Sequence, residues 1–236
     1  MSLEFYRAYL TKEYMMGPNT LRLLEEILQK HPLAPGGRTL DLGCGTGLSS
    51  LYLTRETGAT VFATDLWKSA TDNYRRFSDW GVDQTVIPIH ADANQLPYAD
   101  GFFDAVVSID AYHYFACNST FFREKLFPLV RKGGSVRIVV PGLKEEFRDG
   151  PSPEMYKWAG DEYSLFHSCQ WRKETIGEDP NIESADFFEL SCGDAAWADW
   201  FASGHKYALN DQEFLDSVIN RHMTFVGISI RKKADD

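Results

Sequence analysis

A short apolar run that leads into a glycine-rich turn constrains this chain more than any other feature of its sequence. Residues 39–50 read TLDLGCGTGLSS, so Gly43, Gly45 and Gly47 lie between a strand pattern and the start of a helical pattern. Glycines at such a turn let the chain bend tightly, and they let a ligand approach the backbone N–H groups at the helix N-terminus. The segment therefore predicts a strand–loop–helix unit that binds a nucleotide-like ligand.

The spacing of these glycines differs from that of the dinucleotide-binding fingerprint. The fingerprint is GxGxxG, whereas the residue five places after Gly43 is Leu48 and the third glycine comes one place earlier. An acidic residue, Asp41, also stands two places before Gly43, which is not the NAD pattern. A nicotinamide-dependent oxidoreductase therefore stays open only as the weaker alternative.

Two carboxylates after the next two strand patterns complete a pocket for an adenosine group. Asp65 ends the run VFATD, where a carboxylate can accept hydrogen bonds from both ribose hydroxyls. Asp92 follows the third strand pattern, where it can bind an adenine amino group while the Ala93 backbone N–H serves a ring nitrogen.

Strand and helix patterns alternate from Thr39 onward, which indicates a parallel sheet with crossover helices. The expected strands are 39–42, 60–64, 86–90, 104–109 and 135–140, with Gly133-Gly134 as the turn into the fifth. The expected helices are 19–30, 47–56, 69–80 and 119–130. An aromatic-rich stretch then predicts a helical cap, and the pattern resumes with 186–192, a helix at 211–221 and a strand at 224–232.

The chain is expected to form one domain with four parts. These are an N-terminal helical segment (1–37), a cofactor-binding core (38–142), a cap or substrate region (143–205) and a terminal helix with an antiparallel strand (206–236).

Four motifs follow one another over residues 38–142, namely LDLGCGTG, ATDL, ADANQLPYADGFFDAVVSIDA and LVRKGGSVRIVVPG. In this order they resemble the class I S-adenosylmethionine-dependent methyltransferases, most nearly the small-molecule group that includes quinone-biosynthesis enzymes. The resemblance implies an α/β fold with a Rossmann-like, seven-stranded and mostly parallel sheet, helices on both faces and the cap inserted after the fifth strand.

The resemblance also implies a function and a set of cofactor contacts. The function is transfer of a methyl group from S-adenosylmethionine to a small molecule by in-line displacement, which leaves S-adenosylhomocysteine. Asp110 would lie near the methionine end of the cofactor and Leu66 against the adenine. The implied cofactor-binding residues are Asp41, Gly43, Cys44, Gly45, Gly47, Asp65, Leu66, Asp92, Ala93 and Asp110.

A base is optional in this reaction, because orientation of the acceptor supplies much of the rate. His113 is the candidate base, since it follows the fourth strand at the ligand crevice and histidine titrates near neutral pH. The alternative is that His113 only packs beside the cofactor or fixes its loop.

Aromatic residues give the candidates for the acceptor site. Tryptophan rings attract cations, so an amine acceptor or the sulfonium itself would be favoured beside them. The alternative is that the rings bury the cap against the sheet, because aromatic residues dominate core packing. The candidate substrate residues are Tyr14, Tyr112, His167, Trp171 and Trp197.

Composition and charge narrow the partners. The chain has 24 Lys+Arg against 34 Asp+Glu and a formal charge of −10, which disfavours nucleic acid, as does SIDAYH in place of an NPPY-type tetrapeptide. No apolar run is long enough to span a membrane, and the four cysteines show no metal-site or disulfide spacing. A cytoplasmic protein without a metal is expected, a homodimer is compatible, and a non-catalytic S-adenosylmethionine-binding or regulatory protein stays open.

Overall fold

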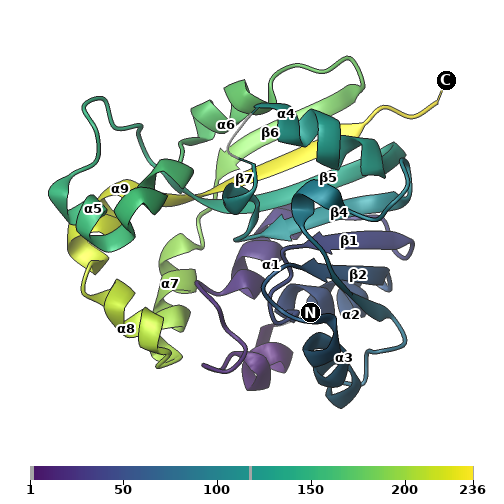
Figure 1. The fold of residues 1–236 in the computed structure, drawn as a ribbon, viewed down its shortest axis with the longest axis horizontal. Coiled ribbons are helices and arrows are strands. Elements are labelled where there is room, and N and C mark those ends of the chain that lie inside the picture. The colour runs from purple at the N-terminus through teal and green to yellow at the C-terminus, as the bar shows by residue number, and fades with distance from the viewer. Residues whose placement is uncertain (1–2, 117–118, 236) are drawn as a thin grey trace.

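Seven strands form one sheet in the order β3-β2-β1-β4-β5-β7-β6 in the computed structural model, which describes residues 3–116 and 119–235 (Figure 1). β7 pairs antiparallel with both β5 and β6, and the other neighbours pair in parallel. The strands are β1 (Arg38–Leu42), β2 (Thr60–Asp65), β3 (Val86–His90), β4 (Phe103–Ile109), β5 (Val130–Leu143), β6 (Ile182–Glu189) and β7 (Met223–Lys232). The chain order reverses between β1 and β4, where open α/β sheets bind ligands.

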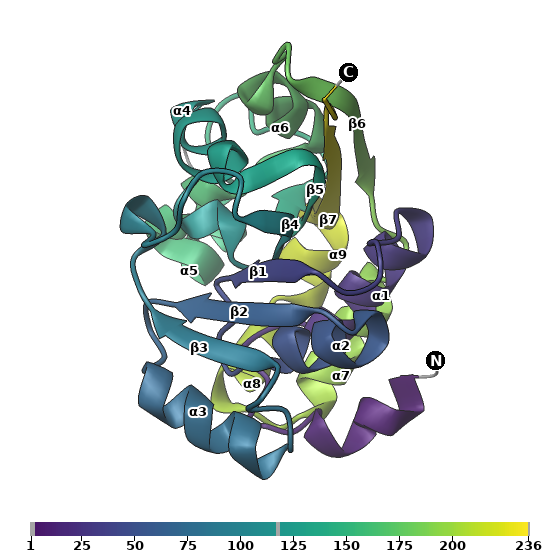
Figure 2. The same cartoon turned by 90° about the vertical axis from the view of Figure 1, so that its right-hand side faces the viewer.

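Helices cover both faces of this sheet (Figure 2). The side chains of α1, α2 and α7 share one buried cluster, and α4 and α6 pack on the opposite face. The helices are α1 (Thr20–Lys30), α2 (Leu48–Thr57), α3 (Ala70–Asp79), α4 (Ser119–Phe121), α5 (Pro153–Ala159), α6 (Cys169–Ile176), α7 (Gly193–Ala202), α8 (Lys206–Gln212) and α9 (Asn220–His222). The seven-stranded, mostly parallel fold with helices on both faces is therefore confirmed.

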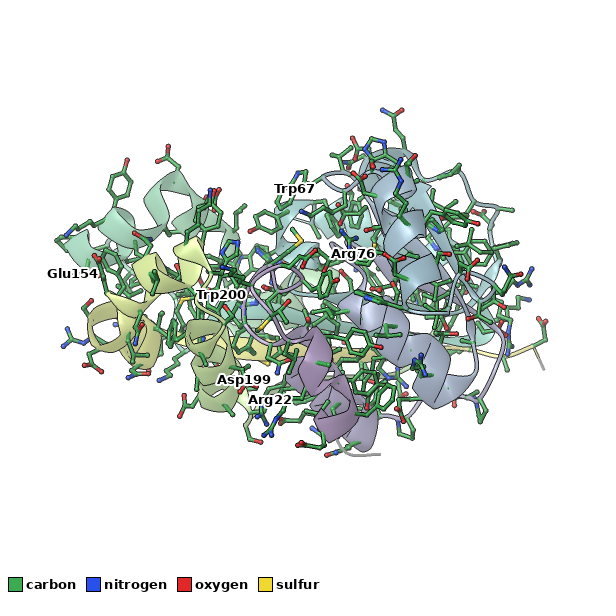
Figure 3. The ribbon with its side chains drawn as sticks, turned by 90° about the horizontal axis from the view of Figure 1, so that it is seen from below. Arg22, Trp67, Arg76, Glu154, Asp199 and Trp200 are labelled. Carbon is green, nitrogen blue, oxygen red and sulfur yellow. The ribbon has the colours of Figure 1, made fainter. Side chains whose placement is uncertain are left out.

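Helix α1 follows from its sequence and is tied to α7. The Asn19 side chain caps it by accepting a hydrogen bond from the Leu21 N–H at 3.0 Å, and its apolar face is fully buried. On its other side, the Asn19 amide donates to Asp199 of α7 at 2.6 Å. Arg22 lies beside Asp199 as well, with Nε 2.5 Å from the carboxylate (Figure 3). These contacts fix α1 against the segment that follows β6.

Two expected helices are broken into shorter pieces. The stretch 119–130 consists of α4, a π-helical turn (Phe122–Leu126) and a 3₁₀ turn (Phe127–Leu129), because Pro128 lacks the N–H that an α-helix would use there. The expected helix at 211–221 is divided between the end of α8, a π-helical turn (Leu215–Ile219) and α9.

The fifth strand begins earlier than expected. Gly133 and Gly134 lie within β5 rather than before it, and the pairing with β4 shifts register at this point. Gly133 has φ +69°, and a Cβ on Gly134 would lie 2.8 Å from the Asp104 carbonyl oxygen. The glycines therefore form an irregularity inside the strand.

The region after β5 forms a separate group of helices and also extends the sheet. α5, α8 and α9 lie together beyond the carboxyl ends of the parallel strands (Figure 1). β6 starts at Ile182, before the expected 186–192, and becomes the sheet edge. Of these helices only α5 lies within the expected cap, 143–205; the same segment also contributes α6 and α7 to the two faces of the sheet and β6 to its edge.

Candidate functional site

A cavity of about 310 Å³ lies at the carboxyl ends of β1, β2 and β4. Segments from four strand ends and the N-terminal region meet there, although they are far apart in the sequence. The lining consists of residues 14, 16, 17, 20, 43–46, 48–49, 65–67, 91–94, 109–111 and 114–115. Among the residues that the structure describes, none after 142 lines this cavity.

The glycine loop between β1 and α2 has left-handed backbone at all three glycines. A Cβ on Gly43 would lie 2.3 Å from the Ala111 Cβ, and one on Gly45 would lie 2.8 Å from the Met16 sulfur. Gly43, Cys44 and Gly45 line the cavity, whereas Gly47 lies behind the loop, where its Cβ would lie 2.2 Å from a ring carbon of Phe77. The absence of side chains therefore leaves a backbone cradle open to a ligand.

Asp41, on β1, is hydrogen-bonded to the start of the helix that follows this loop. Its Oδ2 accepts hydrogen bonds from the hydroxyls of Ser49 (2.7 Å) and Ser50 (2.5 Å) in the first turn of α2. Its Oδ1 is buried and accepts no hydrogen bond from a described residue. Burial raises the pKa of Asp41 to about 6. Asp41 does not line the cavity, so the cofactor contact expected for it stays a prediction.

Asp65 is held by backbone N–H groups at the end of β2. Its Oδ2 accepts from Gly45 at 2.8 Å, and its Oδ1 accepts from Trp67 (2.7 Å) and Lys68 (2.8 Å). A carboxylate has about four acceptor positions, so these bonds leave about one for a ligand without displacing a backbone group. Asp65 lines the cavity, as expected for a residue that binds a ribose. Its one remaining acceptor position is enough for one ribose hydroxyl, whereas the sequence analysis expected it to bind both.

The residues expected at the adenine lie next to Asp65. Leu66 lines the cavity and half of its surface is exposed. Asp92 and Ala93 line the same wall, and Asp92 Oδ1 accepts from the backbone and side chain of Asn94. These hydrogen bonds lower the pKa of Asp92, so this carboxylate is charged at neutral pH.

Asp110 lines the cavity and has a strained backbone. Its φ of +58° is the only positive value at a non-glycine position in the described part of the chain. A Cβ on Gly17 would lie 2.5 Å from Asp110 Oδ2, so glycine at position 17 makes room for this carboxylate. Burial, with the charge of Asp211 as a second cause, raises the pKa of Asp110 to about 7. Strained residues gather at functional sites.

The candidate base lies behind the cavity wall. His113 is buried and is not a lining residue, and its ring makes tilted contacts with the rings of Tyr114 (4.0 Å between centroids) and Phe166 (5.9 Å). Burial, together with the charge of Arg172, lowers the pKa of His113 to about 3. These observations favour the packing alternative for His113.

The acceptor-site candidates are not brought together. Tyr14 lines the cavity, and its carbonyl accepts a hydrogen bond from the Thr46 hydroxyl at 2.5 Å. Tyr112 is buried against Phe115 and Phe121 and does not line the cavity. Two others form their own pair on the cap, since the His167 and Trp171 rings stack at 3.6 Å. Trp197 is buried in the α1–α7 cluster.

Sequence reasoning missed two aromatic residues, Trp67 and Tyr114, on the apolar rim of the cavity. Met16, Trp67 and Tyr114 are exposed apolar residues that line it, and the rings of Trp67 and Tyr114 meet edge to face at 4.9 Å. Their sequence signal was position alone, because Trp67 and Tyr114 follow two of the strands whose ends form the site. Exposed apolar residues that gather at one opening indicate a binding surface.

Within the described ranges 3–116 and 119–235, no group of three or more His, Cys, Asp or Glu side chains could hold a metal ion. Cys44, Cys169 and Cys192 are free thiols, and Cys117 lies outside the described residues. The same ranges contain no helix with the length and apolar character needed to cross a membrane.

An open α/β sheet with a glycine loop and acidic residues at its carboxyl edge defines a nucleotide-binding protein of the Rossmann-like class. Residues 40–138 match the methyltransferase domain family. This region is therefore similar to methyltransferase domains, and the chain has the fold of a methyltransferase solved with S-adenosylmethionine.

Three known proteins show the range of this similarity. The chain is 31% identical to the methyltransferase GfsG of Streptomyces halstedii over 118 residues, which are 50% of this chain and 42% of that protein. The chain thus matches less than half the length of this curated relative. Phosphoethanolamine N-methyltransferase 2 of Haemonchus contortus, solved with S-adenosyl-L-methionine, has a TM-score of 0.76 at 15% identity, over 94% of this chain and 54% of that chain.

The cyclase SpnF has the same fold, with a TM-score of 0.71 at 17% identity over 91% of this chain and 82% of that chain. One scaffold therefore carries more than one activity.

Proposed function

We propose that the chain binds S-adenosylmethionine in the cavity and transfers its methyl group to a small-molecule acceptor. The observation that carries this proposal is the convergence of the glycine loop, Asp65, Leu66, Asp92 and Asp110 on one cavity. The acidic composition of the chain disfavours nucleic acid as the acceptor.

The residues present fit this cofactor. The side-chain-free backbone at Gly43 and Gly45 admits a ligand close to the chain, Asp65 keeps an acceptor position for a ribose hydroxyl, and Leu66 offers an apolar surface to the adenine. Three aspartates and no Lys, Arg or His occur among the described lining residues. Such a lining suits a cofactor whose methionine portion, with a sulfonium, an ammonium and one carboxylate, has a net positive charge.

When bound, the cofactor supplies a methyl group on a positively charged sulfur, which is an electrophile. The task of the protein is then to orient an acceptor and to exclude water from it. The rim formed by Met16, Trp67 and Tyr114 supplies apolar surface for both purposes. Because His113 is buried and its pKa is lowered, we do not assign it the role of a base.

Calorimetric titration tests cofactor binding. S-adenosylmethionine and S-adenosylhomocysteine are expected to bind, and NAD is not. Asp92→Asn should weaken binding about tenfold by removing a charged acceptor. The matched control Asp79→Asn, on α3 and outside the cavity lining, should leave it unchanged. Preferential binding of NAD would overturn the proposal in favour of an oxidoreductase.

Methyl transfer needs its own measurement, because the fold is shared with a cyclase. A panel of small amines, phenols, thiols and acids should include at least one compound that yields S-adenosylhomocysteine in the presence of the protein. Cofactor binding without turnover on any panel member would instead support the non-catalytic alternative.

A further inference from the structure

We propose that the methyl acceptor is a neutral phenol, whose ring packs against Trp67 and Tyr114 and whose hydroxyl proton passes to Asp110. This inference rests on the proposed function, because it names the acceptor class and a catalytic residue of the same site. Its grounds are the charge of the cavity wall, the exposed rings at the cavity opening, and a carboxylate in the same wall that accepts no hydrogen bond from a described residue.

The charge of the cavity wall favours a neutral acceptor. Asp65, Asp92 and Asp110 line the cavity, and no Lys, Arg or His occurs among the described lining residues. This surface repels an anionic acceptor. An ammonium group, in turn, has no lone pair with which to attack a methyl carbon until it loses a proton. A neutral molecule is therefore the acceptor that suits this wall.

The opening of the cavity has exposed aromatic rings. Four of the ten large apolar side chains that are exposed in the described part of the chain line this one cavity, namely Met16, Leu66, Trp67 and Tyr114. The rings of Trp67 and Tyr114 meet edge to face with their centroids 4.9 Å apart. Trp67 is 64% exposed in spite of this contact, so ring area stays free for a third ring. Aromatic rings attract one another beyond the effect of the area that they bury, which favours a ring in the acceptor.

Asp110 is the carboxylate of this wall that is free to take a proton. Asp65 accepts from three backbone N–H groups and Asp92 from Asn94, whereas the Asp110 side chain accepts from no described residue. The strained backbone at position 110 is retained at a place where it presents this carboxylate to the cavity. Burial raises the pKa of Asp110 to about 7, so it is a stronger proton acceptor than an ordinary carboxylate.

The carboxylate and the aromatic rim lie on neighbouring backbone. Tyr114 ends the 3₁₀ turn that begins two residues after Asp110. A Cβ on Gly17 would lie 2.5 Å from Asp110 Oδ2, and the residue before Gly17 is Met16, which belongs to the rim. An acceptor that packs against this rim is therefore next to a carboxylate.

The methyl transfer needs one proton acceptor, which Asp110 supplies. The phenolic oxygen forms the bond to the methyl carbon, and the bond between that carbon and sulfur breaks with its electron pair left on sulfur. The phenolic proton passes to a carboxylate oxygen of Asp110, so that a sulfonium and a carboxylate become a neutral thioether and a neutral carboxyl group. A phenol suits this base better than an aliphatic alcohol does, because a phenol ionises at about pH 10 and an alcohol well above it.

Binding is tested on protein loaded with S-adenosylhomocysteine, with 2-naphthol as the probe. Calorimetry should show 2-naphthol binding about fivefold more tightly than decahydro-2-naphthol, which keeps the hydroxyl but lacks the aromatic rings. The anion 2-naphthoate should bind more weakly than either. Trp67→Leu should remove the preference for 2-naphthol and leave S-adenosylhomocysteine affinity unchanged. The matched control Tyr207→Leu replaces an exposed ring outside the cavity lining and should change no affinity.

Turnover tests the role of Asp110. The wild type should convert 2-naphthol to 2-methoxynaphthalene, and Asp110→Asn should lower kcat about a hundredfold or more. The affinities of this variant for 2-naphthol and S-adenosylhomocysteine should change little by comparison. Turnover by the wild type should fall as the pH decreases below 7, because a protonated carboxyl cannot take the phenolic proton, and Asp110→Asn should lack this dependence.

Three results would overturn the inference and leave the proposed function standing. They are equal binding of 2-naphthol and decahydro-2-naphthol, no methylation of bound 2-naphthol by the wild type, and an unchanged kcat in Asp110→Asn. A loss of S-adenosylhomocysteine affinity in Asp110→Asn as large as its loss of kcat would also overturn it, because Asp110 would then act on the cofactor. Failure of S-adenosylhomocysteine to bind to the wild type would instead overturn the proposed function. Thermal unfolding of each variant shows that it is folded.

Discussion

Asp110 combines three features, namely a left-handed backbone, a carboxyl whose pKa is raised by desolvation, and a place in a cavity wall. The first feature is tolerable because aspartate and asparagine adopt positive φ more readily than other non-glycine residues. The second makes the charged form unfavourable in the absence of a ligand. Charged Asp110 thus lowers the stability of the fold and at the same time presents a negative charge to a ligand in the cavity.

Replacing Asp110 with Asn tests this trade. Because the folded-state pKa is raised from 3.8 to about 7, the folded chain binds more protons than the unfolded chain between these values. The stability that depends on protonated Asp110 is therefore fully present below pH 4 and is lost as the pH rises through 7. Between pH 5 and pH 8 the wild type should lose about 2 kcal/mol more unfolding free energy than Asp110→Asn, measured by denaturant titration without cofactor.

A wild type and variant with parallel pH profiles would contradict that prediction. Asn at position 110 keeps the backbone preference, so a difference between the profiles reports the charge and not the turn.

Residues set by local spacing could be predicted from the sequence, and those set by tertiary packing could not. Gly43, Gly45 and Asp65 follow from strand ends and turn geometry, and all of them line the cavity. His113 is close to the cavity in sequence, yet its ring turns toward Phe166 of the cap. No local sequence pattern singles out Asp211, because the donors to its carboxylate are the indoles of Trp158 and Trp200 on two other helices.

At the scale of elements, Gly47 lets α2 approach α3. A methyl group there would lie 2.2 Å from the fully buried ring of Phe77, in a backbone conformation with φ +89° that disfavours a side chain. Gly47→Ala should therefore lower the unfolding free energy by about 3 kcal/mol or more.

Gly58→Ala is the matched control at the opposite end of the same helix. Its φ of +70° carries the backbone cost, but a Cβ would meet no atom within 4 Å. Denaturant unfolding should show a loss of only about 1 kcal/mol for this variant. Equal losses at positions 47 and 58 would show that Phe77 is not the cause.

Element types were predictable wherever periodicity was strong, and element ends were less so. β1, β2 and β3 lie within a residue or so of the positions expected from sequence, because turns and glycines bound them. The start of β5 was misplaced, because a glycine pair indicates a turn whether it lies before a strand or within one. The stretch 119–129 has helical periodicity, but Pro128 and the packing around it divide it.

At the scale of the molecule, the cavity belongs to the sheet and not to the cap. Its described lining comes from the N-terminal region and the strand ends, while α5 and α6 contribute nothing to it. Hydrogen exchange should show this division. Binding of S-adenosylhomocysteine should slow exchange in segments 43–49, 65–67, 91–94 and 109–115, and leave the α5–α6 region unchanged.

The comparison of exchange in the two regions supplies its own control, since both are measured in one sample by mass spectrometry. Protection of the α5–α6 region as strong as that of the glycine loop would show that the cap closes on the cofactor.

β7 is the last strand to be synthesised, and it pairs with the two strands on either side of it. β7 lies between β5 and β6, although both precede it in the chain. During synthesis, β6 therefore leaves the ribosome with no partner to receive it, and its backbone groups stay bonded to water until β7 follows. Chaperone protection of a nascent chain of this design is needed most during the interval between these two strands.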